Sequence, residues 1–299
     1  MTTNKYLPQY LIKACKQHPE YGRLITYKNI SEGVGPALSI RANGQEFDFV
    51  FSQSPFNDEA AIALIVDKES AQEALSSHIL MPATTIFSKS ESLHDITALV
   101  QSMIASGEME YPIVVKPNKE SLSKGGFIVR DDAELQECVT RCSEISHSSG
   151  SILVQEYIPS DTELRVMFFE GEVIGIINKN LANIENTRVG PGVEDEWGKV
   201  FLIHDEELKD RLTEITRFLT EQHGLVYGGL DVRIDARNGD LYLLEANPAP
   251  MGYEILEFKL EGGQEIIDKI TSKMLDKIVR DSQPALKSTP NVMAAMNLG

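Results

Sequence analysis

The segment Leu243-Leu-Glu-Ala-Asn-Pro-Ala-Pro250 carries the strongest signal in the chain, because an apolar strand there ends in polar residues and two prolines. Alternate side chains of a β-strand share one face, so Glu245 and Asn247 are predicted to point the same way. A carboxylate and an amide oxygen at a strand end form a hard-oxygen site that suits Mg2+. Taken alone, the segment is equally consistent with a surface strand that leads into a proline-rich turn.

A second strand that can contribute to this site lies just upstream, in Gly229-Leu-Asp-Val-Arg233. The two strands are predicted to form a hairpin through Asn238-Gly239. Asp231 joins the site only if it lies opposite Glu245, or an even number of residues away, because a shift of one residue turns every side chain to the other face. We therefore expect a bulged loop of odd length, three or five residues, in this hairpin. A two-residue turn would place Asp231 opposite Ala246, on the wrong face.

Asp231, Glu245 and Asn247, gathered from adjacent strands, make a metal site the favoured interpretation of the hairpin. Arg233 shares the face of Asp231 by the same alternation. Its guanidinium could meet a phosphate or pair with a carboxylate, and the sequence leaves both alternatives open.

Another informative stretch runs Tyr111-Pro-Ile-Val-Val-Lys-Pro117 and continues as Asn118-Lys-Glu-Ser-Leu-Ser-Lys-Gly-Gly126. An apolar strand that ends in Lys116 and opens into a small, flexible loop can place an ammonium group and backbone N–H groups on phosphates. The loop is not a P-loop, because it leads into a strand whereas the P-loop motif leads into a helix. On its own the pattern is weak, since most Ser/Gly loops are only turns.

The stretch Ile152-Leu-Val-Gln-Glu-Tyr-Ile-Pro159 is followed by Glu163 and Arg165. A strand that opens into an irregular, proline-stopped segment exposes main-chain donors and acceptors that can bind an adenine edge. Glu163 could accept hydrogen bonds from both ribose hydroxyls. The alternative for Glu163 and Arg165 is a cross-strand salt bridge on the surface of a hairpin.

Length and composition are those of an ordinary globular protein, with 299 residues, 42% hydrophobic and 24% charged. The net charge of −17 argues against nucleic acid as a partner, which requires a basic face. The apolar runs are far shorter than the roughly 20 residues that span a bilayer. We therefore expect no membrane partner, no secretory signal and a cytoplasmic location. Cys15, Cys138 and Cys142 include no CxxC pair and are expected to be buried structural thiols.

The predicted elements alternate between strands and helices, which is typical of an α/β protein. The expected strands cover 23–27, 37–41, 47–52, 84–87, 111–116, 127–130, 152–155, 163–169, 172–178, 226–234 and 240–246. After a short N-terminal helix, the expected helices cover 58–77, 90–106, 131–146, 205–222 and 263–280. The stretch 181–199 has few periodic apolar residues and is expected to be a loop.

Taken in order, these stretches resemble the ATP-grasp superfamily over about residues 58–260, most specifically in Gly229-Leu-Asp-Val and Leu244-Glu-Ala-Asn-Pro. In that superfamily two α+β subdomains close on ATP, and an N-terminal α/β lobe helps to bind the substrate. The resemblance implies an N-terminal lobe at 1–80, a nucleotide-lid subdomain at 81–158 and a metal-binding, catalytic subdomain at 159–281. A loosely ordered tail would follow at 282–299.

The resemblance also implies roles for individual residues. Lys116 would contact the nucleotide phosphates, under a lid at 121–126 that includes Ser123, Gly125 and Gly126. The residues that would hold the adenine are Gln155, Glu156, Tyr157 and Ile158, and Glu163 would hold the ribose. The ligands of one or two Mg2+ ions, with Mn2+ as an alternative, would be Asp231, Glu245 and Asn247.

A closer likeness is to the ATP-grasp part of cyanophycin synthetases and of bifunctional glutathione synthetases. It is carried by Glu163-Leu-Arg-Val166, Lys179-Asn-Leu-Ala-Asn-Ile184 and Asp67-Lys68, and it adds Lys68 as a second nucleotide lysine. The chain departs from those families where their Thr-Lys is Ala71-Gln72, their arginine is Lys179 and their proline is Leu181. We expect none of their appended domains here, so their chemistry can be carried over but their substrates cannot.

These features predict an ATP-dependent ligase that activates a carboxylate as an acyl phosphate and joins it to an amine, releasing ADP and phosphate. The substrates would be small molecules such as an amino acid or short peptide. Arg165 is the candidate for holding the acyl phosphate, and Lys179 and Arg233 complete the catalytic set. The alternatives are thioester-forming or carboxylase chemistry on the same fold and a non-catalytic ATP-binding regulatory protein. Similar ligases are usually homodimers, which is the expected assembly.

Overall fold

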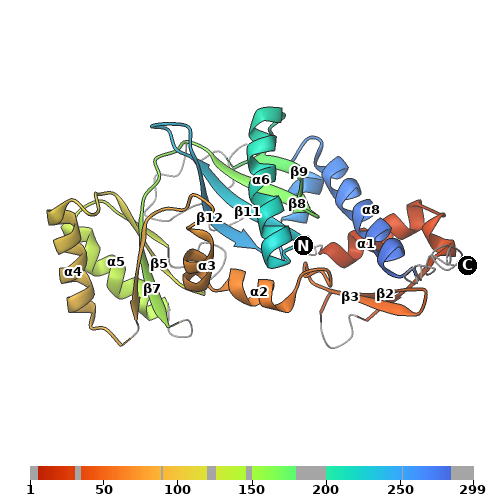
Figure 1. Cartoon of the computed structure of the whole chain (residues 1–299), viewed down its shortest axis with the longest axis horizontal. Helices are drawn as coiled ribbons and strands as arrows, with labels where there is room; N and C mark the ends of the chain where they lie inside the picture. Colours follow the sequence, from red (N-terminus) through yellow and green to blue (C-terminus); the bar gives the residue numbers. More distant parts are fainter. Residues whose placement is uncertain are drawn as a thin grey trace, which may run out of the picture.

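The computed structural model describes residues 6–30, 35–88, 90–119, 126–145, 150–179, 200–250 and 252–283. This part of the chain forms three antiparallel sheets in an elongated arrangement, with a five-stranded sheet in the middle (Figure 1). A four-stranded sheet lies at one end and a three-stranded sheet lies at the other. The mixture of helices and sheets confirms the predicted α/β class. Within these residues, no helix combines the length and the apolar character needed to cross a bilayer.

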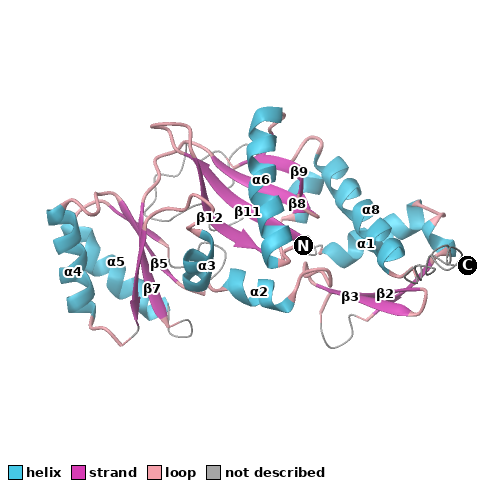
Figure 2. Cartoon of the chain, viewed as in Figure 1, coloured by secondary structure: helices cyan, strands magenta, loops and turns pink. Residues whose placement is uncertain are grey.

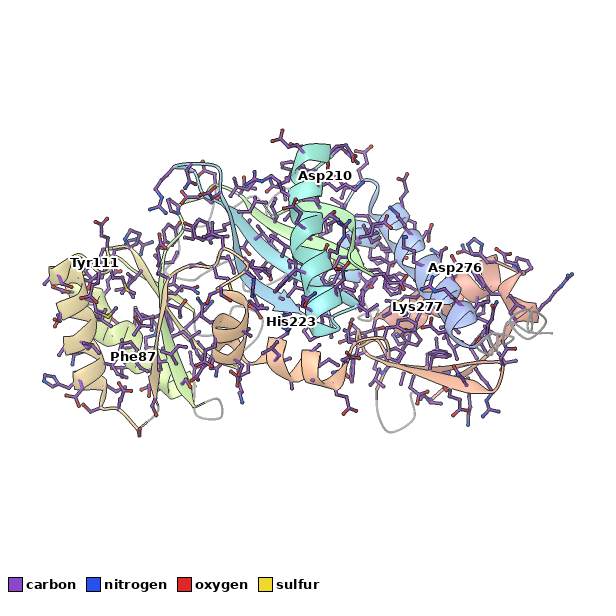
Figure 3. All side chains as sticks on the ribbon, viewed as in Figure 1. Phe87, Tyr111, Asp210, His223, Asp276 and Lys277 are labelled. Carbon is purple, nitrogen blue, oxygen red and sulfur yellow. The ribbon has the colours of Figure 1, made fainter. Side chains whose placement is uncertain are left out.

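The three-stranded sheet is built near the N-terminus. Its elements are α1 (Leu7–Gln17), η1 (Tyr21–Arg23), β1 (Ile25–Asn29), β2 (Ala37–Ala42) and β3 (Gln45–Val50). These elements share one hydrophobic cluster with α7 (Tyr253–Phe258) and α8 (Gly263–Asp281) from the other end of the chain. Tyr21 donates a hydrogen bond of 2.7 Å to Asp276, which lies on α8 beside Lys277 (Figure 3). The C-terminal helix therefore belongs to the same packed unit as the N-terminal elements.

The central sheet has the strand order β10-β9-β8-β11-β12. Its strands are β8 (Glu163–Phe169), β9 (Glu172–Asn178), β10 (Phe201–Leu202), β11 (Tyr227–Ile234) and β12 (Leu241–Asn247). One face is covered by α2 (Glu59–Val66), α3 (Lys68–Leu75) and α6 (Glu206–His223). The other face packs on α8 and the N-terminal elements, through Met167, Phe169 and Tyr227. That second face also carries the polar residues described below.

Helix α6 shows how the sequence produces this packing. Leu208, Leu212 and Leu219 recur at helical spacing and are buried against the sheet. Asp205 caps the start of the helix by accepting a 3.0 Å hydrogen bond from the Leu208 N–H. Asp210 is exposed and lies near the N-terminal end of α6 (Figure 3).

The four-stranded sheet has the order β4-β7-β5-β6 and is covered by helices on one side only (Figure 2). Its elements are β4 (Thr84–Ser88), α4 (Leu93–Ser106), β5 (Ile113–Pro117), β6 (Phe127–Val129), α5 (Asp132–Ile145) and β7 (Ser151–Glu156). Phe87, Val115 and Val154 pack with the two helices. By strand alternation, Lys116 and Gln155 point to the opposite face, which looks toward the central sheet.

The chain passes between these two sheets twice, at 76–83 and at 157–162, and both crossings are hydrogen-bonded to the β11–β12 hairpin. The Leu243 N–H donates to the Leu80 carbonyl at 2.9 Å, and the Ala236 N–H donates to the Pro159 carbonyl at 2.9 Å. The Arg233 guanidinium adds a bond of 3.2 Å to the Ile158 carbonyl. The hairpin therefore holds both connections.

The register of this hairpin agrees with one part of the sequence prediction and corrects another. Asp231 lies opposite Glu245, as the metal hypothesis requires. The predicted odd-length loop is wrong, because Asp235 and Asp240 close a loop of four residues, 236–239. The register shifts within the strands, where Val232 pairs with Leu243 and leaves Leu244 as an extra residue. A β-bulge thus supplies the offset that we had assigned to the turn.

The expected elements are otherwise present, with ends within about three residues of their predicted positions. One long helix expected at 58–77 is instead two helices, α2 and α3, separated at Asp67. Asp67 has an extended backbone, and its carboxylate accepts a 3.1 Å hydrogen bond from the Ser70 N–H. An aspartate that caps a new helix explains the break. Helix α7 and the short strand β10 were not expected.

Asp67 leads to a prediction about stability and pH. Its carboxylate also accepts from Asn118 at 3.0 Å and pairs with Lys119 at 3.1 Å. Burial by itself raises the pKa of Asp67, but these partners outweigh burial and lower the pKa to about 2. Asp67→Ala is expected to lower the free energy of unfolding by about 1–2 kcal/mol at pH 7, measured by urea denaturation.

The pH dependence follows from the sign of this shift. The folded pKa lies below the unfolded value of about 3.9, so the contribution of Asp67 is complete above about pH 5 and is lost as the pH falls toward 2. The stability gap between the wild type and Asp67→Ala should shrink by about half between pH 6 and pH 3. A gap of constant size over this range would show that the charged carboxylate contributes nothing.

Candidate active site

The candidate site lies on one face of the central sheet, at the end nearer the 157–162 crossing. Along this face β8 carries Phe169, Met167, Arg165 and Glu163, and β11 carries Tyr227, Gly229, Asp231 and Arg233. Phe169 and Met167 at the end of β8 and Tyr227 at the start of β11 are buried in the apolar core. The polar residues lie at the start of β8 and at the end of β11, which are neighbours because the strands are antiparallel. Strand alternation therefore extends one continuous face from the core into a polar site.

Asp231, Glu245 and Asn247 meet at this end of the sheet. Asn247 pairs with Gly229 across the hairpin, next to the Asp231–Glu245 pair. The Asn247 amide donates a 3.2 Å hydrogen bond to Asp231 Oδ2, and Lys68 Nζ lies 3.7 Å from Glu245 Oε1. In the described ranges no three His, Cys, Asp or Glu side chains form a metal-binding group by themselves. A cation here would combine two carboxylates with the amide oxygen and ligands from outside the protein.

A buried ion network lies beside these residues. Lys179 Nζ lies 2.9 Å from Glu163 Oε1 and 2.5 Å from Asp231 Oδ1. Arg233 pairs with the other oxygen of Glu163 at 3.3 Å. The Lys179 and Arg233 side chains are only 5% and 4% exposed. Burial by itself raises the pKa of Glu163, but the charges of Lys179 and Arg233 outweigh it and lower the pKa to about 2.

This network decides between alternatives that the sequence left open. Arg233 pairs with a carboxylate, so that alternative holds in this structure. Glu163 does form cross-strand ion pairs, but with Lys179 and Arg233 rather than with Arg165, and in the interior rather than on the surface. Both of its oxygens already accept from these cations, so a ribose would have to share the Glu163 carboxylate with them.

Arg165 has buried hydrogen-bond donors that are not satisfied by the described residues. Its Nε lies 3.4 Å from Asp231 Oδ1, but Nε and NH1 are buried and make no hydrogen bond with any described residue. Gly229 leaves room for this guanidinium, because a Cβ at that position would lie 3.3 Å from Arg165 NH1 and 2.9 Å from Pro250 Cβ. Buried donors normally have partners. An anionic oxygen group bound to the Arg165 guanidinium would satisfy them.

The second wall of the site comes from the four-stranded sheet. A small cavity between the sheets is lined by residues that include Lys68, Lys116, Gln155, Leu243 and Glu245. Burial lowers the pKa of Lys116 to about 8, although the Glu245 carboxylate opposes this shift. Lys68 also donates a 3.1 Å hydrogen bond to the Asn118 carbonyl, which fixes it beside the end of β5. Lys68 on α3 and Lys116 on β5 therefore both lie near Glu245 on β12.

The predicted adenine-binding residues lie at the end of β7, which holds Gln155 and Glu156, and in the connection that follows it, which holds Tyr157 and Ile158. The Gln155 side chain donates to Thr84 at 2.8 Å, and the Glu156 N–H donates to the Ala83 carbonyl at 2.8 Å. The Tyr157 ring lies under the Arg233 guanidinium, 5.3 Å from ring centre to carbon, and the Ile158 carbonyl accepts from that same group.

Sequence reasoning missed Arg237 in the hairpin loop. Its guanidinium lies 3.1 Å from the Glu156 carboxylate and 2.6 Å from the buried Asp235 carboxylate. Arg237 thereby joins the end of β7 to the β11–β12 hairpin. No sequence signal distinguishes it from a solvated arginine in a turn, because the contact depends on how the two sheets pack.

Part of the predicted site lies outside the described residues. This applies to Ser123 and Gly125 of the expected lid and to the whole of 181–199. Gly126 is described and is buried at the start of β6.

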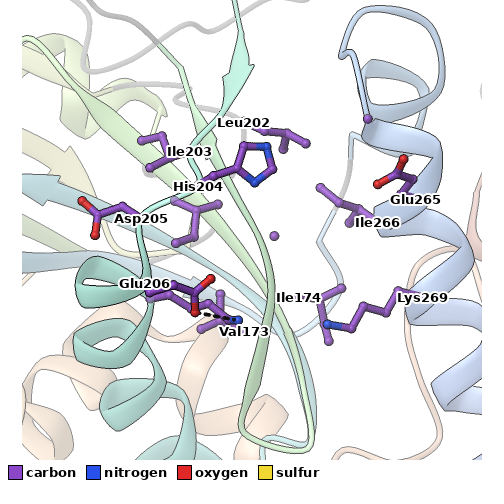
Figure 4. Close-up of a pocket in the computed structure, with 14 residues that line it drawn as sticks. Val173, Ile174, Leu202, Ile203, His204, Asp205, Glu206, Glu265, Ile266 and Lys269 are labelled. Carbon is purple, nitrogen blue, oxygen red and sulfur yellow. Dashed lines mark hydrogen bonds and ion pairs between the residues drawn. The ribbon is translucent and has the colours of Figure 1, made fainter.

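A separate groove of about 190 Å3 opens at the β9–β10 edge of the central sheet, between the starts of α6 and α8 (Figure 4). Three of its charged side chains form ion pairs: Glu206 with Lys209 at 3.4 Å, and Lys269 with Glu172 at 3.0 Å. The groove does not contain the residues of the candidate site.

Comparison with known proteins supplies an independent line of argument. The chain is similar over residues 68–270 to the RimK-like ATP-grasp domain family. A D-alanine–D-alanine ligase of Thermotoga petrophila is 28% identical over 136 residues, which are 43% of this chain and 44% of that protein. The matched regions span only 14% to 44% of the curated relatives.

Two solved structures share the fold at low sequence identity. The D-cycloserine synthetase DcsG is 17% identical, with a TM-score of 0.53 over 71% of each chain. The ATP-grasp ligase PsnB, solved with a minimal precursor, Mg and ADP, is 18% identical, with a TM-score of 0.52 over 75% of this chain and 62% of that chain. At such identities the likeness concerns the fold alone.

Proposed function

This chain belongs to the RimK-like ATP-grasp family, and from that membership and its site we propose that it is an ATP-dependent carboxylate–amine ligase. The observation that supports the proposal most directly is that Asp231, Glu245 and Asn247 lie together on the β11–β12 hairpin and contact lysines from other elements. Lys179, which follows β9, contacts Asp231, and Lys68 on α3 contacts Glu245. Oxygen ligands and lysines around one point are what transfer of a phosphoryl group requires. The substrates would be small molecules such as an amino acid or short peptide.

The proposed reaction has two steps. A carboxylate oxygen attacks the γ-phosphorus of ATP, which forms an acyl phosphate and releases ADP. An amine then attacks the acyl carbon, and the tetrahedral intermediate collapses to an amide with loss of phosphate and a proton. The Arg165 fork, with its buried Nε and NH1, would bind the anionic oxygens that appear in both steps.

The donor set fits Mg2+, since Asp231, Glu245 and Asn247 offer hard oxygens that leave positions open for phosphate oxygens and water. When bound, the ion would neutralise charge on the transferred phosphoryl group. Lys116 and Lys68 would contact phosphates from the side of the four-stranded sheet. Gln155 and the main chain through Ile158 would hold the adenine, and Glu163 would hold the ribose. Arg233, which contacts both Glu163 and the Ile158 carbonyl, would position them.

Isotope transfer tests the reaction. Purified protein would be incubated with ATP, Mg2+ and a panel of carboxylates labelled with 18O, with and without amines. Release of ADP and phosphate that needs both a carboxylate and an amine is expected, and each phosphate should carry one 18O from the carboxylate. Added hydroxylamine should trap the acyl phosphate as a hydroxamate.

The same experiment separates the rival functions. Turnover that needs a thiol, or needs bicarbonate, would indicate thioester or carboxylase chemistry. Phosphate free of carboxylate 18O would contradict an acyl phosphate. Tight ATP binding without substrate-dependent turnover across the panel would indicate a regulatory nucleotide-binding protein.

A further inference from the structure

Lys179 stands where two carboxylates converge. It follows the last residue of β9, and its backbone N–H donates to the Glu163 carbonyl at 2.8 Å, which fixes the base of the side chain. Its ammonium then reaches both Glu163 and Asp231, at 2.9 and 2.5 Å. A compact ammonium on a four-carbon stem can make such contacts and also leave them, whereas a planar guanidinium is held by its fork geometry.

Both oxygens of Asp231 are in contact with nitrogen donors. Oδ1 faces Lys179 at 2.5 Å and Arg165 Nε at 3.4 Å, and Oδ2 accepts from the Asn247 amide at 3.2 Å. The Asp231 side chain is only 12% exposed, so water screens these charges little. A divalent cation therefore cannot reach Oδ1 unless the Lys179 ammonium moves away.

Glu163 gives Lys179 a second anchor during such a movement. The carboxylate of Glu163 contacts Lys179 through Oε1 and Arg233 through Oε2. If Lys179 leaves Asp231, the bond to Glu163 keeps the ammonium at the edge of the site rather than releasing it to solvent. The phosphates of a bound nucleotide would then offer the ammonium a new anionic partner.

We propose that Lys179 is the resident counter-ion of Asp231 in the metal-free site, and that a divalent cation enters by displacing it. This inference rests on the proposed function, because it takes Asp231 as a metal ligand. It implies that the bare cation binds weakly, since it must strip Asp231 of a buried charge partner. Nucleotide and metal then bind cooperatively, because the nucleotide accepts the displaced lysine.

Binding of Mn2+ in the absence of nucleotide tests the inference. The free Mn2+ signal would be followed by electron paramagnetic resonance at fixed pH and ionic strength. Lys179→Gln, which removes the charge but keeps a donor, should bind Mn2+ at least about tenfold more tightly than the wild type. Lys179→Arg should stay within about threefold of the wild type. The matched control is Lys273→Gln on α8, where the lysine pairs with Glu172 at 2.6 Å away from the site; its Mn2+ affinity should not change.

A non-hydrolysable ATP analogue measures the cooperativity. In the wild type the analogue should tighten Mn2+ binding strongly. In Lys179→Gln this enhancement should fall at least about tenfold, because no lysine remains to be displaced or to accept the phosphates. An unchanged or weaker nucleotide-free Mn2+ affinity in Lys179→Gln would overturn the inference.

Asp231→Asn separates failure of the inference from failure of the proposed function. If Asp231→Asn binds Mn2+ as the wild type does, the metal site itself is misplaced and both proposals fall. If Asp231→Asn loses Mn2+ while Lys179→Gln matches the wild type, only the counter-ion inference is wrong. Should Lys179→Gln fail to fold, Glu163→Gln serves instead. It removes the negative charge of Glu163 that competes with Asp231 for the ammonium, so it should weaken nucleotide-free Mn2+ binding at least about threefold. Unchanged binding would contradict the inference.

Discussion

Asp231→Asn is expected to lower kcat by about 100- to 1000-fold while the protein remains folded. The substitution preserves the shape of the side chain and removes the anionic oxygen that the proposed cation needs, and loss of one such electrostatic contact costs about 100- to 1000-fold in turnover. It also leaves Lys179 and Arg165 with less negative charge nearby. ADP release under saturating ATP and substrate measures the effect.

Folding is expected to survive because Lys179 keeps Glu163 as a partner, at 2.9 Å. The free energy of unfolding should fall by about 1–3 kcal/mol, as when one member of a buried polar network is neutralised. Asp240→Asn is the matched control, since Asp240 is half-buried at the end of the 236–239 loop of the same hairpin. Its carboxylate accepts a 2.7 Å hydrogen bond from Asn238, which an amide oxygen at position 240 can also accept. Asp240→Asn should leave both turnover and stability at wild-type levels. A kcat for Asp231→Asn above about a tenth of the wild-type value would remove Asp231 from the catalytic set.

Arg165→Met should reduce turnover by at least about 100-fold and should leave stability within about 1 kcal/mol of the wild type. The two effects have one cause. Arg165 Nε and NH1 are buried without hydrogen-bond partners among the described residues, so the folded protein gains little from them. A methionine of similar length fills the same space without unsatisfied donors. The anionic reacting groups, however, would lose the paired N–H donors of the Arg165 guanidinium.

Arg141→Met on α5 is the control for this substitution, because Arg141 forms a 3.5 Å surface ion pair with Glu137 and lies over the Phe127 ring, and neither contact involves the candidate site. It should have no effect on turnover. Arg165→Lys should retain part of the activity, because it keeps the charge and loses the two-pronged geometry. A large drop in the stability of Arg165→Met with little change in kcat would identify Arg165 as structural.

The sequence predicted the parts of the fold that depend on local pattern. Alternation along 163–169 and 226–234 correctly placed Arg165 and Asp231 on faces that a site can use. The helix predicted at 205–222 is present as α6 over Glu206–His223. These features follow from residues close in sequence, so a single chain reveals them.

The parts that the sequence could not predict depend on contacts between distant segments. In the sequence, Leu244 looks like any other residue of an apolar strand. It forms a bulge because it has no paired residue on β11, and only the assembled hairpin shows this. Lys179 meets Asp231 only after β9, β8 and β11 assemble side by side, and the sequence therefore indicated a catalytic lysine without its carboxylate partners. Arg237 reaches Glu156 only because two sheets pack across the 157–162 crossing.

The two crossings at 76–83 and 157–162 constrain how a nucleotide can enter. Both are bonded to the β11–β12 hairpin, through Leu80 and through Pro159. Any rotation that parts the two sheets must turn about these attachments, because the described chain connects the sheets nowhere else. The β11–β12 hairpin, which bears Asp231 and Glu245, would therefore also be the hinge of that rotation. Substitutions in the 236–239 loop would then change the association and dissociation rates of the nucleotide without altering any residue of the proposed metal site.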